Sequence, residues 1–250
     1  MPSREPVAVV TGGAGGIGTA ICRTLAQAGF AVVVGYRESA QQAQALLSTL
    51  GGAGHCAMRA PVTDSAALQT LAAAVQDRYE RCDVLVNCAG ITRFVAHADL
   101  DGLDDALIDD ILHTNVRGSF AAVRALAPLL RASTQVGGAV IVNISSIAAR
   151  TAMGSNVMYC ASKAALDNLT LSLARALAPS VRVVSVSPGL VDTEFVRSLD
   201  AGWRDEQARR TPLGCLAVPA QIGAAVLAVV RDLTFSTGCV LAVDGGRPLN

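Results

Sequence analysis

The residues best suited to chemistry in this chain are a tyrosine and a lysine four positions apart, in Tyr159-Cys160-Ala161-Ser162-Lys163. Positions i and i+4 of a helix lie on the same side, one turn apart. A phenol with an ordinary pKa of about 10 is a poor acid or base at neutral pH, and a neighbouring cation favours its ionised form. Lys163 is the only lysine among the 20 basic residues, all others being arginine. This compact ammonium beside Tyr159 predicts a proton-transfer site.

A second group of residues could hold a phosphate. The segment Thr11-Gly12-Gly13-Ala14-Gly15-Gly16-Ile17-Gly18 follows the apolar run Val7 to Val10 and precedes a helical stretch. Glycines let the backbone approach a ligand closely, and the free N–H groups and dipole at a helix N-terminus favour an anion. Because the loop stands between a strand and a helix, we expect a nucleotide site rather than a merely tight turn.

These segments need strands and helices to position them, and β-branched runs alternate with longer alanine-rich and leucine-rich stretches. Such alternation predicts an α/β fold, with a parallel sheet covered by helices on both faces. The expected strands are Val7 to Val10, Ala31 to Val34, Val84 to Val86, Val140 to Ile144, Val181 to Val186 and Val240 to Val243. The weaker run His55 to Ala60 completes a sheet of seven strands.

The helical stretches place the candidate residues at helix starts and strand ends. We expect helices over Gly16 to Ala28, Ala40 to Leu50, Ser65 to Tyr79, Leu103 to Leu130, Val157 to Leu177 and Pro219 to Leu233. Pro128 should end or bend the fourth helix, and Gly29 follows the first as a C-cap residue would. No linker, repeat or low-complexity tract divides the chain, which indicates a single domain over 1–250.

Composition excludes several other classes of protein. The 250 residues carry 20 acidic side chains against 20 basic ones, so no net field would attract nucleic acid or an anionic membrane. Val7 to Val10 is too short for a signal-peptide core, and prolines interrupt the uncharged run Thr211 to Val230. We expect a soluble, untargeted protein that needs no membrane partner.

Cysteines and histidines show no metal-binding pattern. The seven cysteines are odd in number and include no Cys-x-x-Cys pair, which favours small buried residues in a reducing cytoplasm over a disulfide or zinc framework. His55, His97 and His113 lie far apart in the sequence without ligand-like spacing. We expect no bound metal.

The spacing Gly12-x-x-x-Gly16-x-Gly18, together with Tyr159 and Lys163, resembles the short-chain dehydrogenase/reductase family. The resemblance covers the chain from Val7 to Gly246 and implies a single-domain, doubly wound Rossmann-type fold. The subgroup that looks most similar is the beta-ketoacyl carrier-protein reductases, through Ala89-Gly90-Ile91-Thr92-Arg93 and the segment Thr237 to Gly246.

The resemblance implies four catalytic residues: Asn115, Ser146, Tyr159 and Lys163. Ser146 stands thirteen residues before Tyr159, after an expected strand, and would hydrogen-bond the substrate oxygen. Asn115 would open its helix locally and hold a water that links Lys163 to solvent, although a purely structural, kink-forming asparagine is the alternative. A serine hydrolase is disfavoured, because the chain has no Gly-x-Ser-x-Gly elbow and no suitably placed histidine.

The cofactor-binding residues implied by the resemblance come from several strand ends. Asn87, in Asn87-Cys88-Ala89-Gly90, looks like a wall beside the adenosine ribose and a brace for the sheet. Pro188, Gly189 and Thr193 would border the nicotinamide, and the polar stretch that follows looks like a substrate lid, at about 190–211. The full set is Gly12, Gly16, Ile17, Gly18, Arg37, Val62, Asn87, Ala89, Gly90, Tyr159, Lys163, Pro188, Gly189 and Thr193.

The end of the second strand indicates which nicotinamide cofactor is used. It reads Val34-Gly35-Tyr36-Arg37, without the carboxylate that holds the ribose 2′-hydroxyl of NAD. Arg37 could pair with the 2′-phosphate of NADPH (NADP+), so NADPH is expected and NADH less so. The alternative is a solvent-facing arginine paired with Glu38, and Gly15 stands where many NADPH-dependent relatives have a second basic residue.

The adenine pocket departs from the family pattern. The usual Asp-Val pair after the third strand is replaced by Pro61-Val62, and proline offers neither a carboxylate nor a backbone N–H. Adenine recognition would then rest on the backbone near Val62 and on packing. Asp64 is expected to cap the helix that begins at Ser65.

We therefore predict an NADPH-dependent reductase of a small ketone or aldehyde, with Tyr159 as general acid. One alternative is a beta-ketoacyl carrier-protein reductase, although the segments Ser133 to Gly138 and Ala178 to Ser180 lack the basic residues that an acidic carrier would need. Two further alternatives are an NAD-dependent alcohol dehydrogenase and a non-catalytic cofactor-binding regulatory protein. The resemblance also implies a homotetramer or homodimer, with which the apolar segment Val226 to Val243 is compatible.

Overall fold

Seven parallel strands form one sheet in the computed structural model, which describes residues 5–249. The strands are β1 (Val7–Thr11), β2 (Ala31–Tyr36), β3 (Cys56–Arg59), β4 (Val84–Asn87), β5 (Ala139–Ile144), β6 (Val181–Pro188) and β7 (Cys239–Val243). Their order across the sheet is β3-β2-β1-β4-β5-β6-β7. The predicted α/β, Rossmann-type sheet is confirmed, including its third strand.

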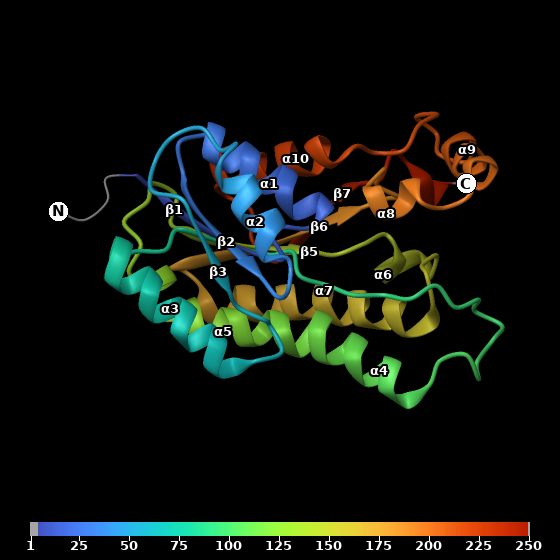
Figure 1. The fold of residues 1–250 in the computed structure, drawn as a ribbon, viewed down its shortest axis with the longest axis horizontal. Coiled ribbons are helices and arrows are strands. Elements are labelled where there is room, and N and C mark those ends of the chain that lie inside the picture. Colours follow the sequence, from blue (N-terminus) through green and yellow to red (C-terminus); the bar gives the residue numbers. More distant parts are fainter. Residues whose placement is uncertain (1–4, 250) are drawn as a thin grey trace.

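Helices cover both faces of this sheet (Figure 1). On one face lie α1 (Gly16–Gln27), α2 (Ala40–Leu47) and α10 (Pro219–Arg231). On the other face lie α3 (Ser65–Tyr79), α5 (Ser119–Arg131) and α7 (Val157–Leu177). Successive strand residues point to opposite faces, so Val9 joins the core under α3 and α5 while Val10 joins the core under α1 and α10. This double burial explains why the strands are almost entirely apolar.

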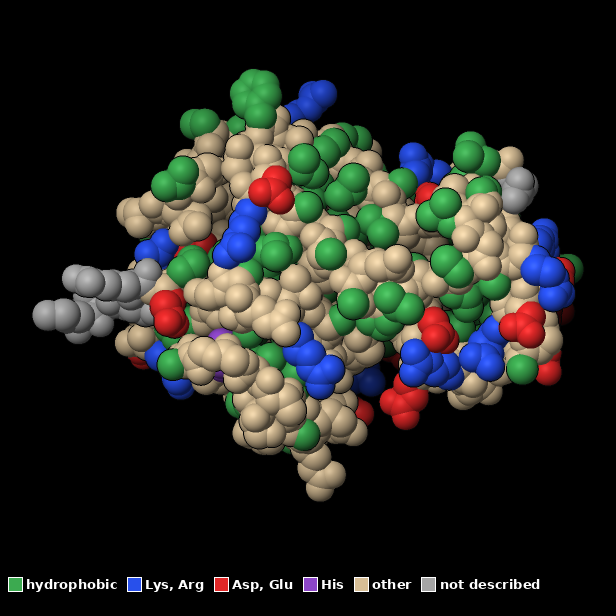
Figure 2. Space-filling view, turned by 90° about the horizontal axis from the view of Figure 1, so that it is seen from above, with side chains coloured by type: hydrophobic (Ala, Val, Ile, Leu, Met, Phe, Trp, Pro, Cys, Tyr) green, Lys and Arg blue, Asp and Glu red, His purple; other side chains and the backbone are tan. Residues whose placement is uncertain are grey.

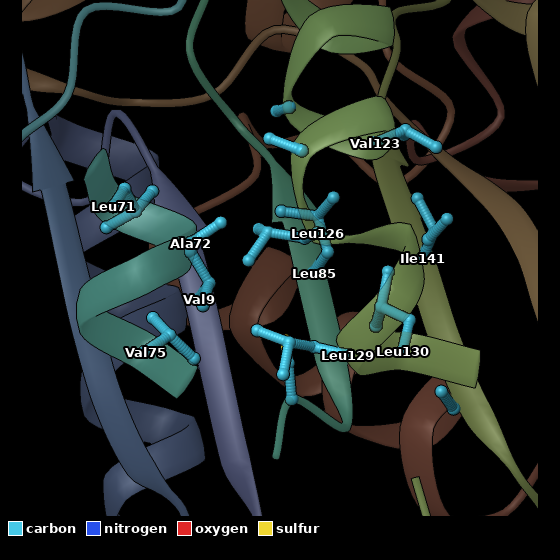
Figure 3. Close-up of a cluster of buried hydrophobic side chains, with 14 of the residues drawn as sticks. Val9, Leu71, Ala72, Val75, Leu85, Val123, Leu126, Leu129, Leu130 and Ile141 are labelled. Atoms are coloured by element: carbon cyan, nitrogen blue, oxygen red, sulfur yellow. The ribbon is translucent and has the colours of Figure 1, made fainter. Parts of the chain in front are cut away.

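The core on the α3 and α5 side is an interdigitated layer of leucine and valine (Figure 3). Leu71 and Val75 of α3 and Leu126 of α5 lie over Val9 and Leu85 of the central strands. The five side chains are fully buried or nearly so. Burial of each such side chain contributes about 1.5–3 kcal/mol to folding, so the layer holds β1 and β4 at fixed positions.

The predicted helix Leu103 to Leu130 is divided in three. It consists of α4 (Asp105–Leu112), a π-helical segment (His113–Gly118) and α5, which run on without a break. Pro128 does not end the helix, which continues to Arg131. A proline costs a helix the hydrogen bond of its missing N–H, and here that loss falls close to the helix end. Asp64 caps α3 as expected, its side chain accepting from Ala66 N (2.9 Å) and Ala67 N (3.1 Å).

Short helices lie at the carboxyl edge of the sheet. They are α6 (Ala148–Thr151), α8 (Glu194–Arg197), α9 (Ala201–Arg209) and a 3-10 turn (Arg247–Leu249). Figure 2 shows charged side chains of both signs gathered at the end of the molecule that carries α8 and α9. Within residues 5–249, no helix is long and apolar enough to cross a membrane.

Candidate active site

A cavity of about 840 Å³ lies along the carboxyl edge of the sheet, where the strand order reverses between β1 and β4. Its wall runs from Arg37 and Ser39, past the glycine loop, to Tyr159 and Lys163. Open α/β sheets bind ligands at such switch points. The predicted cofactor residues on this wall are Gly12, Gly16, Ile17, Gly18, Arg37, Val62, Ala89, Gly90, Tyr159, Lys163 and Thr193.

The glycine loop needs its glycines at two positions. Gly12 has φ +62°, and a Cβ there would lie 2.8 Å from Ala89 Cα. A Cβ on Gly18 would lie only 2.2 Å from Gly12 O. The loop therefore closes tightly on itself and on the end of β4, which leaves the first turn of α1 open to the cavity.

Thr11 holds this loop against the end of β4. Its Oγ1 accepts from Cys88 N (3.1 Å) and Ala89 N (3.2 Å). Asn87 braces the next strand, since its Nδ2 donates to Asn143 Oδ1 at 2.9 Å. The side-chain oxygen of Asn87, Oδ1, is buried and has no hydrogen-bond partner among the described residues. Such an unpaired acceptor fits a ligand that brings a donor.

Tyr159 and Ser146 meet although they come from different elements. Asn156 accepts from Tyr159 N (2.6 Å) and so caps the helix α7 on which Tyr159 stands. Ser146 follows β5, and its side chain hydrogen-bonds that of Tyr159. Burial raises the pKa of Tyr159, and the hydrogen bond to Ser146 lowers it in part. The raised pKa differs from the expectation of a lowered one, because burial outweighs the effect of neighbouring groups.

Lys163 lies one turn further along α7 and is buried. Its Nζ donates to Ile144 O at 2.8 Å and lies 5.7 Å from the centroid of the Tyr159 ring. Burial lowers the pKa of Lys163 to about 8, while Cys88 and Asp167 act to raise it. Tyrosine and lysine thus face the same space, as their spacing predicts.

Asn115 lies in the π-helical segment and faces the same end of the cavity. Its Oδ1 accepts from Ile91 N (2.8 Å), and its Nδ2 donates to Ile91 O (3.1 Å) and Ser162 Oγ (3.0 Å). A Cβ on Gly90 would lie 3.3 Å from Asn115 Oδ1 and 3.6 Å from Lys163 Nζ. The helix is opened locally at this residue, and the amide side chain ties the loop after β4 to α7.

Three predicted cofactor residues lie off the main cavity wall. Asn87 is buried behind it, and Pro188 is the last residue of β6, where its carbonyl accepts from Ile147 N at 2.9 Å. Gly189 packs on Asp244 and lines a separate cavity of about 530 Å³ beneath Leu213 and Cys215. The other predicted cofactor-binding and catalytic residues lie together at the cavity. Ser146 is next to Tyr159 there, and Asn115 lies against Gly90.

Thr193 connects the predicted lid to the glycine loop. It caps α8 through Val196 N (3.4 Å), and a Cβ on Gly16 would lie 3.1 Å from its Cγ2. Further along the lid, Trp203 of α9 meets Phe94 of the loop after β4 edge to face, with ring centroids 6.5 Å apart. The lid therefore contacts both sides of the site.

The sequence analysis missed several residues of the site. Asn156 stands three positions before Tyr159, and asparagine at that distance ahead of a helical segment is a recognisable N-cap signal. Ser39, Gln42 and Thr63 line the cavity, as does Phe195, which lies within the predicted lid. The first three residues follow no spacing rule, so the sequence carried no signal for them.

A parallel sheet with a glycine loop at its switch point, and a tyrosine, serine and lysine at the far end of the cavity, defines a class of nucleotide-binding α/β proteins. The family model described as short chain dehydrogenase matches residues 6–203. The chain belongs to the short-chain dehydrogenase/reductase family. It is thus an oxidoreductase that acts on carbonyl or alcohol substrates with a nicotinamide dinucleotide.

Individual proteins support this assignment over almost the whole chain. Cis-4-hydroxycyclohexanecarboxylate dehydrogenase of Sinomonas cyclohexanicum is 38% identical over 246 residues, which is 97% of this chain and 96% of that protein. The 3-oxoacyl-[acyl-carrier-protein] reductase of Escherichia coli is 34% identical over 242 residues, 96% of each chain. The solved structure of a short-chain dehydrogenase/reductase from Serratia marcescens has a TM-score of 0.88 and 33% identity, covering 99% of this chain and 100% of that one.

The residues present fit the cofactor that the family implies. The tight glycine cradle and the open N-terminus of α1 suit the phosphates of a dinucleotide. The cavity is long enough to reach from the end of β2 to Tyr159.

Proposed function

We propose that this protein reduces a small ketone or aldehyde with NADPH, using Tyr159 as general acid. The observation that carries the proposal is the continuous cavity, which joins Arg37 at one end to Tyr159 and Lys163 at the other. When bound, the reduced nicotinamide supplies the hydride that the carbonyl carbon accepts.

The protein's own residues manage the oxygen and its proton. Ser146 orients the carbonyl oxygen through its hydroxyl, next to the Tyr159 phenol to which it is hydrogen-bonded. Tyr159 donates its proton to this oxygen as negative charge develops there. The Lys163 ammonium, held by Ile144 O, then stabilises the phenolate that remains. Asn115 fixes the loop and helix on either side of Lys163 and would support proton return to Tyr159 from solvent.

The preference for NADPH rests on the end of β2. Arg37 lines the cavity with Ser39 and Gln42, and no carboxylate ends the strand. Arg37 forms an ion pair of 3.5 Å with the exposed Glu38. This pair is the one expected if Arg37 were only a solvent-facing arginine. An exposed pair of this kind is worth about 0–1 kcal/mol, so the 2′-phosphate can displace Glu38 easily.

The substrate enters between the loop after β4 and the lid at 190–211. Phe195 lies on the cavity wall, and Phe94 meets Trp203 where the loop after β4 contacts the lid, which favours a substrate with an apolar body. A beta-ketoacyl thioester is the second candidate, favoured by the 34% identity to the E. coli carrier-protein reductase. Both substrates would use the same proton-transfer residues.

The test is to measure NADPH and NADH oxidation with a panel of ketones, aldehydes and beta-ketoacyl thioesters. We expect NADPH to be preferred, and Arg37→Asp to reverse the preference. Tight NADPH binding without turnover of any substrate would instead support a non-catalytic regulatory protein. Faster alcohol oxidation with NAD than with NADP would support the dehydrogenase alternative.

For assembly we propose a homotetramer or homodimer in a reducing cytoplasm. Phe120 of α5 and Leu171 of α7 are exposed on neighbouring helices and would be covered by a second copy. The seven cysteines all lie within the described residues and all are free, as a reducing compartment favours.

A further inference from the structure

The loop between β3 and α3 forms part of the cavity wall. Pro61, Val62 and Thr63 all line the cavity, where the adenine end of a dinucleotide is expected. Pro61 has no N–H to donate, and Asp64 is occupied in capping α3. The shape of this wall therefore depends on whatever holds Val62 and Thr63 in place.

Two residues of the π-helical segment hold this loop. Arg117 Nη1 donates to Thr63 O at 3.0 Å, and its Nη2 donates to Ser65 Oγ at 3.4 Å. One position further on, Gly118 lies against Val62, and a Cβ on Gly118 would be 2.7 Å from Val62 Cγ2. The backbone around Gly118 is helical, with φ −63°, so its lack of a side chain serves this close approach rather than an unusual conformation.

The same short segment carries Asn115, which contacts Ile91 and Ser162 on the catalytic side. A π-helical turn contains an extra residue and changes which side chains share a face. Here it directs Asn115 towards Lys163 and directs Arg117 and Gly118 towards the β3–α3 loop. One segment thus touches both ends of the cavity.

We propose that Arg117, together with the close approach at Gly118, is a positioning element for the adenine half of the cofactor. In the family pattern a carboxylate after β3 contacts the adenine directly. Here Arg117 and Gly118 instead fix the backbone of Val62 and Thr63, without contacting the base. The inference rests on the proposed NADPH binding, and it makes cofactor affinity depend on a residue outside the cavity wall.

The test compares Arg117→Gln and Gly118→Ala with a matched control, Arg124→Gln. Arg124 lies two turns further along the same helix and donates to the same Ser65 Oγ at 3.4 Å, but within residues 5–249 it makes no hydrogen bond to a cavity-lining residue. Dissociation constants are measured for NADPH and for adenosine 2′,5′-bisphosphate, and kcat and KM for NADPH and for reduced nicotinamide mononucleotide, which lacks adenine.

We expect both test variants to bind NADPH and the bisphosphate about three- to tenfold more weakly, a change of about 1 kcal/mol. Their kcat with saturating NADPH, and all parameters with the mononucleotide, should match the unaltered protein and Arg124→Gln. Alanine suits a helix better than glycine, so Gly118→Ala keeps the test valid if Arg117→Gln unfolds.

Three results would overturn the inference. Unchanged affinity in both variants would show that the loop needs no support from the π-helical segment. An equal loss with the mononucleotide would show general damage rather than an adenine-side effect. If the unaltered protein bound neither NADPH nor the bisphosphate, the proposed function would fall as well, which distinguishes that failure from the first two.

Discussion

Lys163 is a buried ammonium that costs the fold stability. Burial lowers its pKa from 10.5 to about 8, which corresponds to roughly 3 kcal/mol against the charged form at pH 7. The hydrogen bond from its charged Nζ to Ile144 O offsets about 1.5 kcal/mol of this cost. The sole lysine of the chain is therefore retained at a position where a neutral side chain would fold better.

We predict that Lys163→Met abolishes reduction and stabilises the protein by about 2 kcal/mol at pH 7, or roughly 4–8 °C in Tm. The folded-state pKa is depressed, so the unfolded chain holds the proton between pH 8 and 10.5. The unaltered protein must then gain stability over that range, and the advantage of the variant must shrink. Thermal unfolding at pH 7 and pH 9.5 measures both effects, and a stability gap that is absent or independent of pH would contradict the burial argument.

The same two groups set the pH dependence of the reaction. Burial keeps Tyr159 protonated, as a general acid must be, while Lys163 loses its charge above about pH 8. We predict that kcat for carbonyl reduction is level below pH 8 and falls above it, because a neutral Lys163 no longer stabilises the phenolate. Stopped-flow rates at saturating NADPH, with unfolding checked at each pH, would test this. A kcat that rises through pH 8 would contradict the prediction and would mean that a group other than Tyr159 acts as the general acid.

Among the secondary-structure elements, the glycine loop makes the sharpest prediction. A Cβ on Gly18 would lie 2.2 Å from Gly12 O, whereas one on Gly15 would lie 3.4 Å from the same atom. Gly15 also has φ −81°, which any residue adopts. We predict that Gly18→Ala weakens NADPH binding at least tenfold, about 1.4 kcal/mol, while Gly15→Ala changes it little. Calorimetric titration of both variants with NADPH measures the two affinities. Equal affinities would contradict the prediction, because the loop would then not need its tight closure at Gly18.

The lid can be followed through Trp203, the only tryptophan of the chain. It meets Phe94 with ring planes at 88°, so movement of α9 must change its surroundings. We predict that adding an alcohol product to the NADP+ complex shifts the Trp203 emission. Phe94→Leu should weaken the shift and raise KM several-fold with kcat nearly unchanged. Phe235, which is fully exposed, gives the control Phe235→Leu. An unmoved spectrum in the unaltered protein would contradict a mobile lid.

The elements differ in how far the sequence could predict them. The helix α3 matches its predicted range because the Asp64 cap defines its start, and α7 matches because its apolar pattern is long. The π-helical segment His113–Gly118 could not be predicted, since a single extra residue hardly disturbs the apolar periodicity of a helix. The helices α8 and α9 were expected only as a polar lid, because α8 spans four residues and four of the nine residues of α9 are charged.

Across the whole molecule, the strand order assembles residues that are far apart in the sequence. Gly12, Ala89 and Tyr159 reach one cavity because β1 and β4 are neighbours and α7 packs on β5 and β6, the next strands across the sheet. Composition and periodicity predicted seven parallel strands but not their order, since the pairing of buried strands leaves no local pattern. The hydrogen bonds that join Asn87, Asn143 and Thr170 beneath the cavity could not be predicted either. They form only when the strand order has brought these residues together.

The lowered Lys163 pKa and the raised Tyr159 pKa also belong to the whole molecule. Spacing alone predicts that the two side chains share a face, but burial under the sheet edge decides how they titrate. The expectation that the lysine would lower the tyrosine pKa considered the pair in isolation. The structure adds the desolvation of both groups, which is the larger effect.

Hydride transfer and the role of Tyr159 can be tested together with NADPH deuterated at the transferable position of the nicotinamide, using the ketone that the panel ranks first. We predict deuterium at the carbinol carbon with the unaltered protein. With Tyr159→Phe we predict product formation at least 10³-fold slower, despite NADPH affinity within about twofold of the original. Turnover by Tyr159→Phe at a rate close to that of the unaltered protein would contradict the assignment of Tyr159 as the general acid.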